Sequence, residues 1–83
     1  MVGATDEALM ADVRAGGTAS LAELFERYHR PLYRFVMRLA GDSDLAEDVV
    51  QETFLRVLKH RLTYRPDRSF RPWLYRIARN VWH

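Results

Sequence analysis

Arginine and aromatic side chains alternate over the last nineteen residues of this chain, 65–83. The segment contains five arginines and four aromatic residues, and its only acidic residue is Asp67. Arginine binds phosphate groups, and aromatic rings offer surfaces on which unstacked bases can stack. The composition of this segment therefore indicates contact with nucleic acid, and with single strands in particular.

Charge is distributed unevenly along the chain. Residues 1–54 hold five arginines against ten acidic residues, a net charge of −5. Residues 55–83 hold eight basic residues against one aspartate, a net charge of +7. The overall charge of +2 conceals this polarity. One half is suited to an anionic polymer, and the other half is expected to meet a different partner.

Bulk properties exclude several classes of protein. A chain of 83 residues makes a single small domain, residues 1–83, that buries only about 60–65% of its unfolded surface. Cysteine is absent and the three histidines are scattered, so we expect no disulfide, metal or cofactor. No signal pattern or long apolar run is present, so we expect a cytoplasmic protein without membrane insertion. An enzyme is the least favoured class, because no nucleophile–base pair, phosphate loop or metal cluster occurs.

Helical periodicity dominates the first half of the chain. A short helix is predicted from a cap at Thr5 to about Ala15. A second helix is predicted to start at a capping box of Ser20 and Glu23. Pro31 falls inside its apolar stripe, where it should kink or split the helix.

Two further helices are predicted in the second half. One begins after Gly41, with Asp44 and Glu47 as a cap-like pair, and a loop over residues 62–68 follows it. Ser69 is expected to cap the last helix. The core face of that helix is predicted to comprise Leu74, Ile77, Ala78 and Val81. With no strand pattern, the fold class is all-α, a compact three-to-four-helix bundle.

The side of the last helix opposite its core face carries polar and aromatic side chains. Trp73, Arg76, Asn80 and His83 are spaced by three, four and three residues, which places them on one stripe. Arginine and asparagine suit the edges of guanine and adenine, and tryptophan suits stacking. The flanking and preceding members of this candidate surface are Tyr75, Arg79, Tyr64, Arg65 and Arg68. For any one of these residues, packing against the core or plain solvation is the alternative. The set as a whole indicates contact with nucleic acid.

The helix that starts near residue 43 exposes acidic and amide side chains. Its outward side carries Glu47, Asp48, Gln51, Glu52 and Leu55. A leucine rimmed by acidic residues is typical of a surface that binds a protein partner. The carboxylates have no histidine or pocket beside them to tune their pKa values, so acid–base or metal chemistry is not favoured. A plain solvated face remains the alternative.

Residues 42–57 read DSDLAEDVVQETFLRV, and residues 70–80 read FRPWLYRIARN. Two motifs in this order resemble region 2 of the bacterial sigma-70 family, within its extracytoplasmic-function group. The resemblance runs from about Ser20 to the end of the chain. The chain ends while the helical pattern continues, and the family's second DNA-binding domain is missing, so we expect a fragment of a longer protein.

The resemblance implies two partners for this chain, core RNA polymerase and promoter DNA. Region 2 of this family docks on a coiled coil of the beta-prime subunit and holds the −10 non-template strand open, with the loop 62–68 as a pocket for an extruded base. The implied polymerase-binding residues are Glu47, Asp48, Gln51, Glu52, Leu55 and Leu58. The implied DNA-binding residues are Tyr64, Arg65, Arg68, Arg71, Trp73, Arg76, Arg79 and Asn80. Because relatives are commonly held inactive by anti-sigma factors, such a protein is a further possible partner.

Two alternatives predict different behaviour. A stand-alone helix-turn-helix protein would bind duplex DNA tightly without polymerase. Against it, no short turn with glycine precedes the last helix. A helical protein-interaction bundle would use the basic face for an acidic partner, and would tolerate loss of Trp73 or Asn80 but not reversal of the charge.

Overall fold

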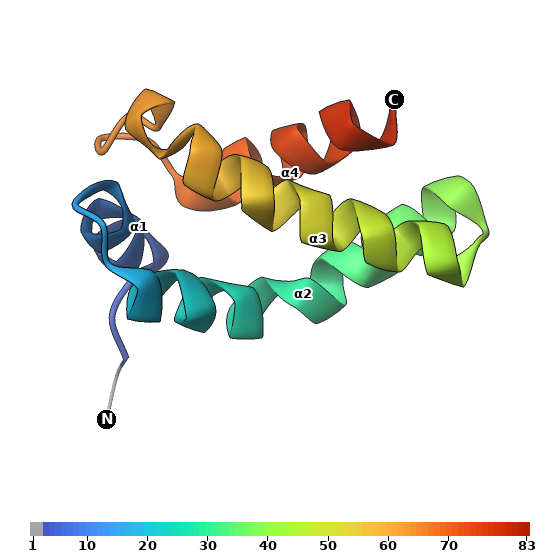
Figure 1. Ribbon diagram of the computed structural model, residues 1–83, viewed down its shortest axis with the longest axis horizontal. Helices are drawn as coiled ribbons and strands as arrows, with labels where there is room; N and C mark the ends of the chain where they lie inside the picture. The colour runs from blue at the N-terminus through green and yellow to red at the C-terminus, as the bar shows by residue number, and fades with distance from the viewer. Residues whose placement is uncertain (1–2) are drawn as a thin grey trace.

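Four α-helices and one short 3-10 turn make up the structure, a computed structural model that describes residues 3–83. Figure 1 shows α1 at one end of the bundle and the α2–α3 turn at the other. The elements are α1 (Asp6–Arg14), α2 (Thr18–Ala40), α3 (Ser43–Lys59), η1 (Arg61–Thr63) and α4 (Phe70–Trp82). No strand occurs within these described residues, and the all-α prediction is confirmed.

Two of the predicted helix starts are wrong. Helix α2 begins at Thr18, after Gly17, because the Ser20 hydroxyl donates a hydrogen bond to the Asp12 carboxylate (2.6 Å) and does not cap. Helix α3 is capped by Asp42, whose carboxylate accepts from the backbone N–H of Leu45 (3.0 Å), and not by Asp44 with Glu47. The predicted Thr5 cap of α1 is confirmed.

Helix α2 continues through Pro31 without splitting. Proline removes one backbone hydrogen bond and crowds the preceding turn. Packing on both sides of it compensates, since Tyr28, Leu32 and Val36 are all buried. The helix ends at Ala40 and is capped by Gly41, whose φ of 69° lies in the left-handed region that glycine adopts most readily.

The core lies where α2 packs against α3 and α1, and where α3 packs against α4. The predicted core face of α4 is partly confirmed. Leu74 and Ala78 are fully buried, whereas Ile77 and Val81 are only half-buried. Phe70 replaces them as the largest buried side chain of this helix, packing its ring against Tyr28 at 5.7 Å between centroids.

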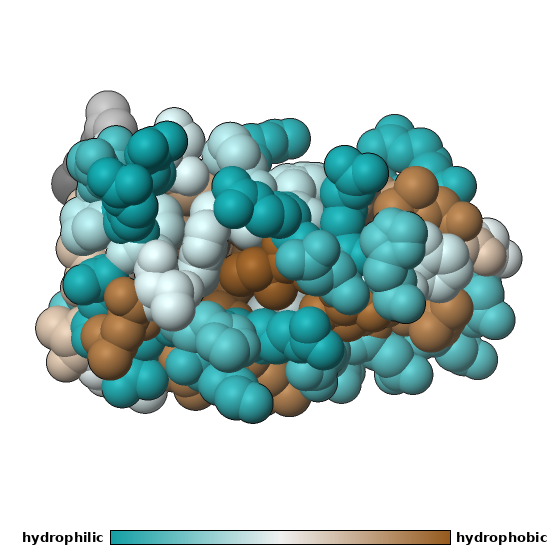
Figure 2. Space-filling model, turned by 90° about the horizontal axis from the view of Figure 1, so that it is seen from above, coloured by the Kyte–Doolittle hydropathy of each residue, from teal (hydrophilic) through white to brown (hydrophobic). Residues whose placement is uncertain are grey.

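Hydrophilic side chains cover most of the face seen in Figure 2, and hydrophobic side chains form the floor of a hollow between them. Over residues 3–83, none of the helices combines the length and the apolar character that crossing a membrane requires.

Candidate functional site

Two adjoining hollows lie where the segment after α3 meets α4, and most of the predicted DNA-binding residues line them. Thr63, Trp73 and Arg76 contribute to both hollows. The first is completed by Tyr64, Arg65, Arg68, Ser69 and Pro72, and the second by Arg56, His60, Ile77 and Asn80. We call them the basic hollows. Trp73 and Arg76 therefore stand where the two hollows meet.

Trp73 is held in place by two other rings. Its indole meets Tyr64 edge-on, with centroids 5.1 Å apart, and lies 6.0 Å from Phe70 at a tilted angle. Both supporting residues are buried, while Trp73 itself is half-buried. An indole anchored on one side and open on the other is suited to stacking against an unpaired base.

Tyr64 does not lie on the surface as predicted from the sequence. Its side chain is only 1% exposed, and its hydroxyl donates to the backbone carbonyl of Arg68. Burial raises the pKa of the Tyr64 hydroxyl, and the Glu7 carboxylate adds to the effect. Its ring is therefore not available to stack on a base. Instead, the Tyr64 ring packs edge-on against the indole of Trp73 and holds it in place.

Arg71 and Arg79 of the predicted set lie outside the basic hollows. The guanidinium of Arg71 lies over the ring of Tyr75, 5.2 Å from the centroid. Tyr75 in turn meets Phe35 of α2 edge-on at 5.1 Å, which places Arg71 on the α2 side of α4. Both arginines are exposed and neither lines the basic hollows.

Sequence reasoning missed three contributors to the basic hollows. Arg56 and His60 lie at the C-terminal end of α3, and Thr63 ends the 3-10 turn. Basic residues at the C-terminal end of a helix also suit its dipole, so in the sequence alone they do not point to a binding site. Their approach to α4 depends on how α3 and α4 pack.

Arg56 of the basic hollows pairs with Glu52 at 3.2 Å, but the other three arginines keep their charge available. Arg65 has a long contact with Asp67, at 3.7 Å, and both side chains are about two-thirds exposed. Exposed pairs of this kind contribute little. Within residues 3–83, neither Arg68 nor Arg76 forms an ion pair. Their guanidinium groups are therefore free to meet an external anion such as phosphate.

The predicted acidic face of α3 is exposed, with one exception. Glu47, Asp48 and Gln51 all face solvent. Leu55 is 62% exposed and Leu58 is 37% exposed. Glu52 is half-buried and accepts a hydrogen bond from Arg56 at 3.2 Å, so it turns toward the basic end of the helix.

An apolar groove between α2 and α3 adjoins this face. The α3 side is formed by Gln51, Leu55 and Leu58 with Phe54, and the α2 side by Thr18, Leu21, Ala22 and Phe25. We call it the α2–α3 groove. The α2 residues were absent from the predicted set, because their spacing also fits a core stripe.

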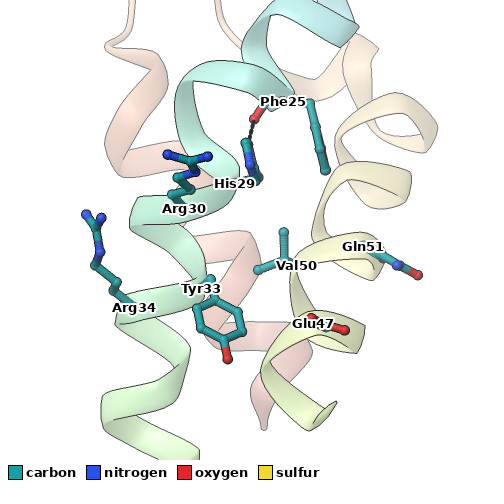
Figure 3. A pocket seen from close by; sticks show the side chains of 8 residues that line it. All are labelled: Phe25, His29, Arg30, Tyr33, Arg34, Glu47, Val50 and Gln51. Carbon is teal, nitrogen blue, oxygen red and sulfur yellow. Dashed lines mark hydrogen bonds between the residues drawn. The ribbon is translucent and has the colours of Figure 1, made fainter. Parts of the chain in front are cut away.

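Gln51 also lines a neighbouring hollow further along the same two helices. There the His29 ring stacks on Phe25, with 4.8 Å between centroids and planes 3° apart, and its Nδ1 lies 2.8 Å from the Phe25 carbonyl oxygen. Figure 3 shows Tyr33 and Val50 between the helices and Arg34 on the side of α2 away from α3. No cluster of His, Cys, Asp or Glu within residues 3–83 is arranged to hold a metal ion.

Comparison with known proteins gives one consistent family. Residues 24–83 match Sigma-70 region 2. The chain is 40% identical over 63 residues to the ECF RNA polymerase sigma factor SigM of Bacillus subtilis, covering 75% of this chain and 37% of that protein. It is 38% identical over 78 residues to SigL of Mycobacterium tuberculosis strain H37Rv, covering 89% and 42%. The chain thus spans about two-fifths of the length of these curated relatives.

A solved structure is similar over nearly the whole chain. It is the NMR structure of an engineered region 2 of sigmaE in complex with GTAAAA, with a TM-score of 0.89 and 32% identity. The match covers 99% of this chain and 86% of that one. Helix α1 and the segment before residue 24 are therefore part of a shared architecture, although they lie outside the matched family region.

Proposed function

Since its residues 24–83 match region 2, this chain belongs to the sigma-70 family, and on that premise we propose that it recognises the promoter −10 element while bound to core RNA polymerase. The whole relatives are more than twice as long as this chain. The proposal therefore concerns one region 2-like domain, residues 1–83, that acts in the cytoplasm by binding and not by catalysis. An anti-sigma factor that covers the same surfaces is a further proposed partner.

The arrangement of the basic hollows is the observation that carries the proposal. An indole with one face open, Trp73, stands beside Arg76 and Asn80, and Arg65 and Arg68 lie on the adjoining loop. This combination provides a stacking surface, base-reading groups and phosphate contacts together. The similar region 2 of sigmaE is in complex with the six-base sequence GTAAAA, which supports single-stranded DNA as the ligand here.

Binding energy alone is sufficient for local strand opening. Separating a stacked step of duplex DNA costs about 1.4 kcal/mol. Capture of one unstacked base by an aromatic surface returns about 1–3 kcal/mol, and arginine–phosphate contacts add attraction that falls with salt. One or two captured bases therefore offset the opening of a few base pairs without ATP.

The exposed face of α3 and the α2–α3 groove supply the proposed polymerase-docking surface. Leu55 and Leu58 offer apolar area, Gln51 lines the same groove, and Asp48 is exposed about one turn earlier on α3. An apolar centre with a polar rim is the usual construction of a protein interface. Ten residues separate the end of α3 from the start of α4, which does not fit the short turn of a helix-turn-helix duplex binder.

Fluorescence anisotropy with purified bacterial core RNA polymerase tests the proposal directly. The 83-residue chain should bind saturably, and the Asp48→Ala/Gln51→Ala double variant should bind more weakly with its helical circular-dichroism spectrum unchanged. The same chain should enrich particular sequences from a randomised single-stranded DNA pool. A folded chain that binds neither polymerase nor single-stranded DNA would contradict the proposed function. Tight binding to duplex DNA alone would favour the helix-turn-helix alternative.

A further inference from the structure

Helix α1 is hydrogen-bonded to both ends of the segment that carries Arg65 and Arg68. This helix, Asp6–Arg14, lies outside residues 24–83, the part of the chain that matches the family region. Its partners are the end of η1 and the first residue of α4, about fifty to sixty positions later in the chain. A helix from the start of the chain is thus in contact with the proposed DNA-binding loop.

Arg14 holds the first end of the loop. Its Nη1 donates to the backbone carbonyl of Leu62 at 3.2 Å and to that of Tyr64. These two carbonyls lie at the end of η1, where the regular helical hydrogen bonding stops. A charged donor shared between two carbonyls fixes the path of the backbone immediately before Arg65.

Glu7 holds the other end. Its Oε2 accepts a hydrogen bond from the backbone N–H of Phe70 at 2.9 Å. Ser69, in the N-cap position of α4, makes no side-chain cap. A carboxylate from α1 therefore takes over the capping function, and its charge also suits the positive end of the α4 dipole.

Helix α1 is itself firmly attached to the core, so it can serve as a support. Met10 and Val13 are 0% and 1% exposed. Asp6 pairs with Arg27 of α2 at 3.0 Å and accepts a hydrogen bond from the Tyr28 hydroxyl. The hydrogen bonds from Arg14 and Glu7 therefore link the loop to a helix that is itself packed in the core.

We propose that Arg14 and Glu7 are positioning residues for single-stranded DNA recognition, which they serve by preforming the basic hollows around Trp73. This inference rests on the proposed function. Neither residue needs to touch DNA. By fixing both ends of residues 65–69, they lower the cost of ordering this loop when a strand binds, which improves affinity and the selection of sequence.

The test compares four variants of the 83-residue chain, Arg14→Gln, Glu7→Ala, Arg14→Lys and Glu7→Gln. The probes are the single-stranded oligonucleotide that the unmodified chain enriches from a randomised pool and a scrambled oligonucleotide of the same composition. Arg14→Gln and Glu7→Ala should each lower the ratio of the two affinities by about tenfold. Arg14→Lys and Glu7→Gln should recover part of it, because lysine can still donate to a carbonyl and the glutamine amide oxygen can still accept from Phe70.

Arg38→Gln is the matched control. It removes the same charge as Arg14→Gln from an exposed position of α2, and within residues 3–83 its side chain makes no hydrogen bond or ion pair. Its affinity ratio should stay at the value of the unmodified chain. Binding of all variants to core RNA polymerase should also be unchanged, since α3 and the α2–α3 groove lie apart from these hydrogen bonds.

A spectroscopic readout separates positioning from loss of the fold. In a Trp82→Phe background, Trp73 is the only tryptophan, and its emission should shift to the red and become more accessible to acrylamide in Arg14→Gln. Unchanged affinity ratios in Arg14→Gln and Glu7→Ala would overturn the inference. If both of these variants unfold, Arg14→Lys and Glu7→Gln decide the question. Full discrimination and unshifted Trp73 emission in these two conservative variants would then overturn the inference. If the unmodified chain enriches no sequence, the proposed function itself fails.

Discussion

The two candidate surfaces of this protein differ in how their residues are held. The α2–α3 groove is built entirely from two long helices that pack along each other, and its leucines simply project from α3. The basic hollows combine α3, η1, a loop and α4, and their shape depends on hydrogen bonds from α1. A rigid helical face suits a permanent protein contact, whereas a supported loop suits a ligand whose bases must be accommodated individually.

The same difference appears in the electrostatics. Two of the four arginines around Trp73 are paired, Arg65 with Asp67 at 3.7 Å and Arg56 with Glu52 at 3.2 Å. Arg68 and Arg76 form no ion pair within residues 3–83. The acidic residues of the α3 face adjoin exposed leucines, Leu55 and Leu58. DNA binding should therefore depend strongly on salt, and polymerase binding should depend more on apolar area.

The largest expected effect would come from neutralising two arginines of the basic hollows. Arg68→Gln/Arg76→Gln should weaken single-stranded DNA binding by at least about a hundredfold, because each guanidinium–phosphate hydrogen bond contributes about 1.5–3 kcal/mol. The dependence of log affinity on log salt should become shallower by about 0.7 for each phosphate that is no longer neutralised. Anisotropy titrations at several salt concentrations measure both quantities.

Arg34→Gln/Arg38→Gln removes the same charge from α2 and serves as the control. An equal loss of affinity in that variant would show that net charge, and not the basic hollows, determines binding. The contrast between the two surfaces would then lose its electrostatic basis.

The next largest effect concerns base selection by Asn80. This exposed side chain lines the hollow on one side of Trp73. Asn80→Ala should reduce discrimination at one or two positions by about 1–3 kcal/mol while leaving affinity for unselected strands nearly unchanged. Competition binding with single-base variants of the enriched oligonucleotide measures this. Equal discrimination before and after the substitution would remove Asn80 from the base-reading set.

A smaller effect is expected at the other surface. Leu55→Ala should weaken binding to core RNA polymerase by about 1–2 kcal/mol, because it removes the most exposed leucine of the α2–α3 groove. Leu62→Ala is the matched control, since Leu62 is 66% exposed but lies outside the groove. If both variants bind polymerase equally well, the groove is not the docking surface.

The smallest effect at neutral pH should come from the Tyr28 hydroxyl, which lies beneath α1. Burial and its hydrogen bond to Asp6 raise the pKa of Tyr28 from 10.0 to about 12. The neutral form is therefore favoured in the folded state, and the free energy of unfolding should fall as pH rises from about 10 to about 12. Tyr28→Phe should flatten this decline in urea titrations. A decline of the same slope in Tyr28→Phe would rule out this residue as its source.

Sequence periodicity was sufficient for the helices and for the exposed side of α3. The spacing of Glu47, Asp48, Gln51 and Leu55 on one helix determines which of them share a face, whatever the rest of the chain does. The four-helix prediction succeeded for the same reason. Its errors at Ser20 and Asp44 concern helix starts, where one side chain chooses between neighbouring donors.

The loop residues could not be placed in the same way. Tyr64 and Trp73 are both aromatic residues in a basic segment, yet Tyr64 is buried and Trp73 is half-exposed. The difference depends on Phe70 and on the bond from Arg14, which is fifty positions from Tyr64. A pairing at that separation leaves no periodic signal, so the sequence offered the composition of this surface without its arrangement.

The bond between Glu7 and the N-terminus of α4 also affects where the minimal unit of this protein begins. A boundary drawn from the family match alone would fall at residue 24. Such a truncated chain would retain every arginine and aromatic residue of the basic hollows. However, α4 would lose the Glu7 cap, and the loss of the buried side chains of Met10 and Val13 would expose the core. Expression of the domain for crystallisation, or its fusion to another protein, should therefore keep residues 5–23 intact.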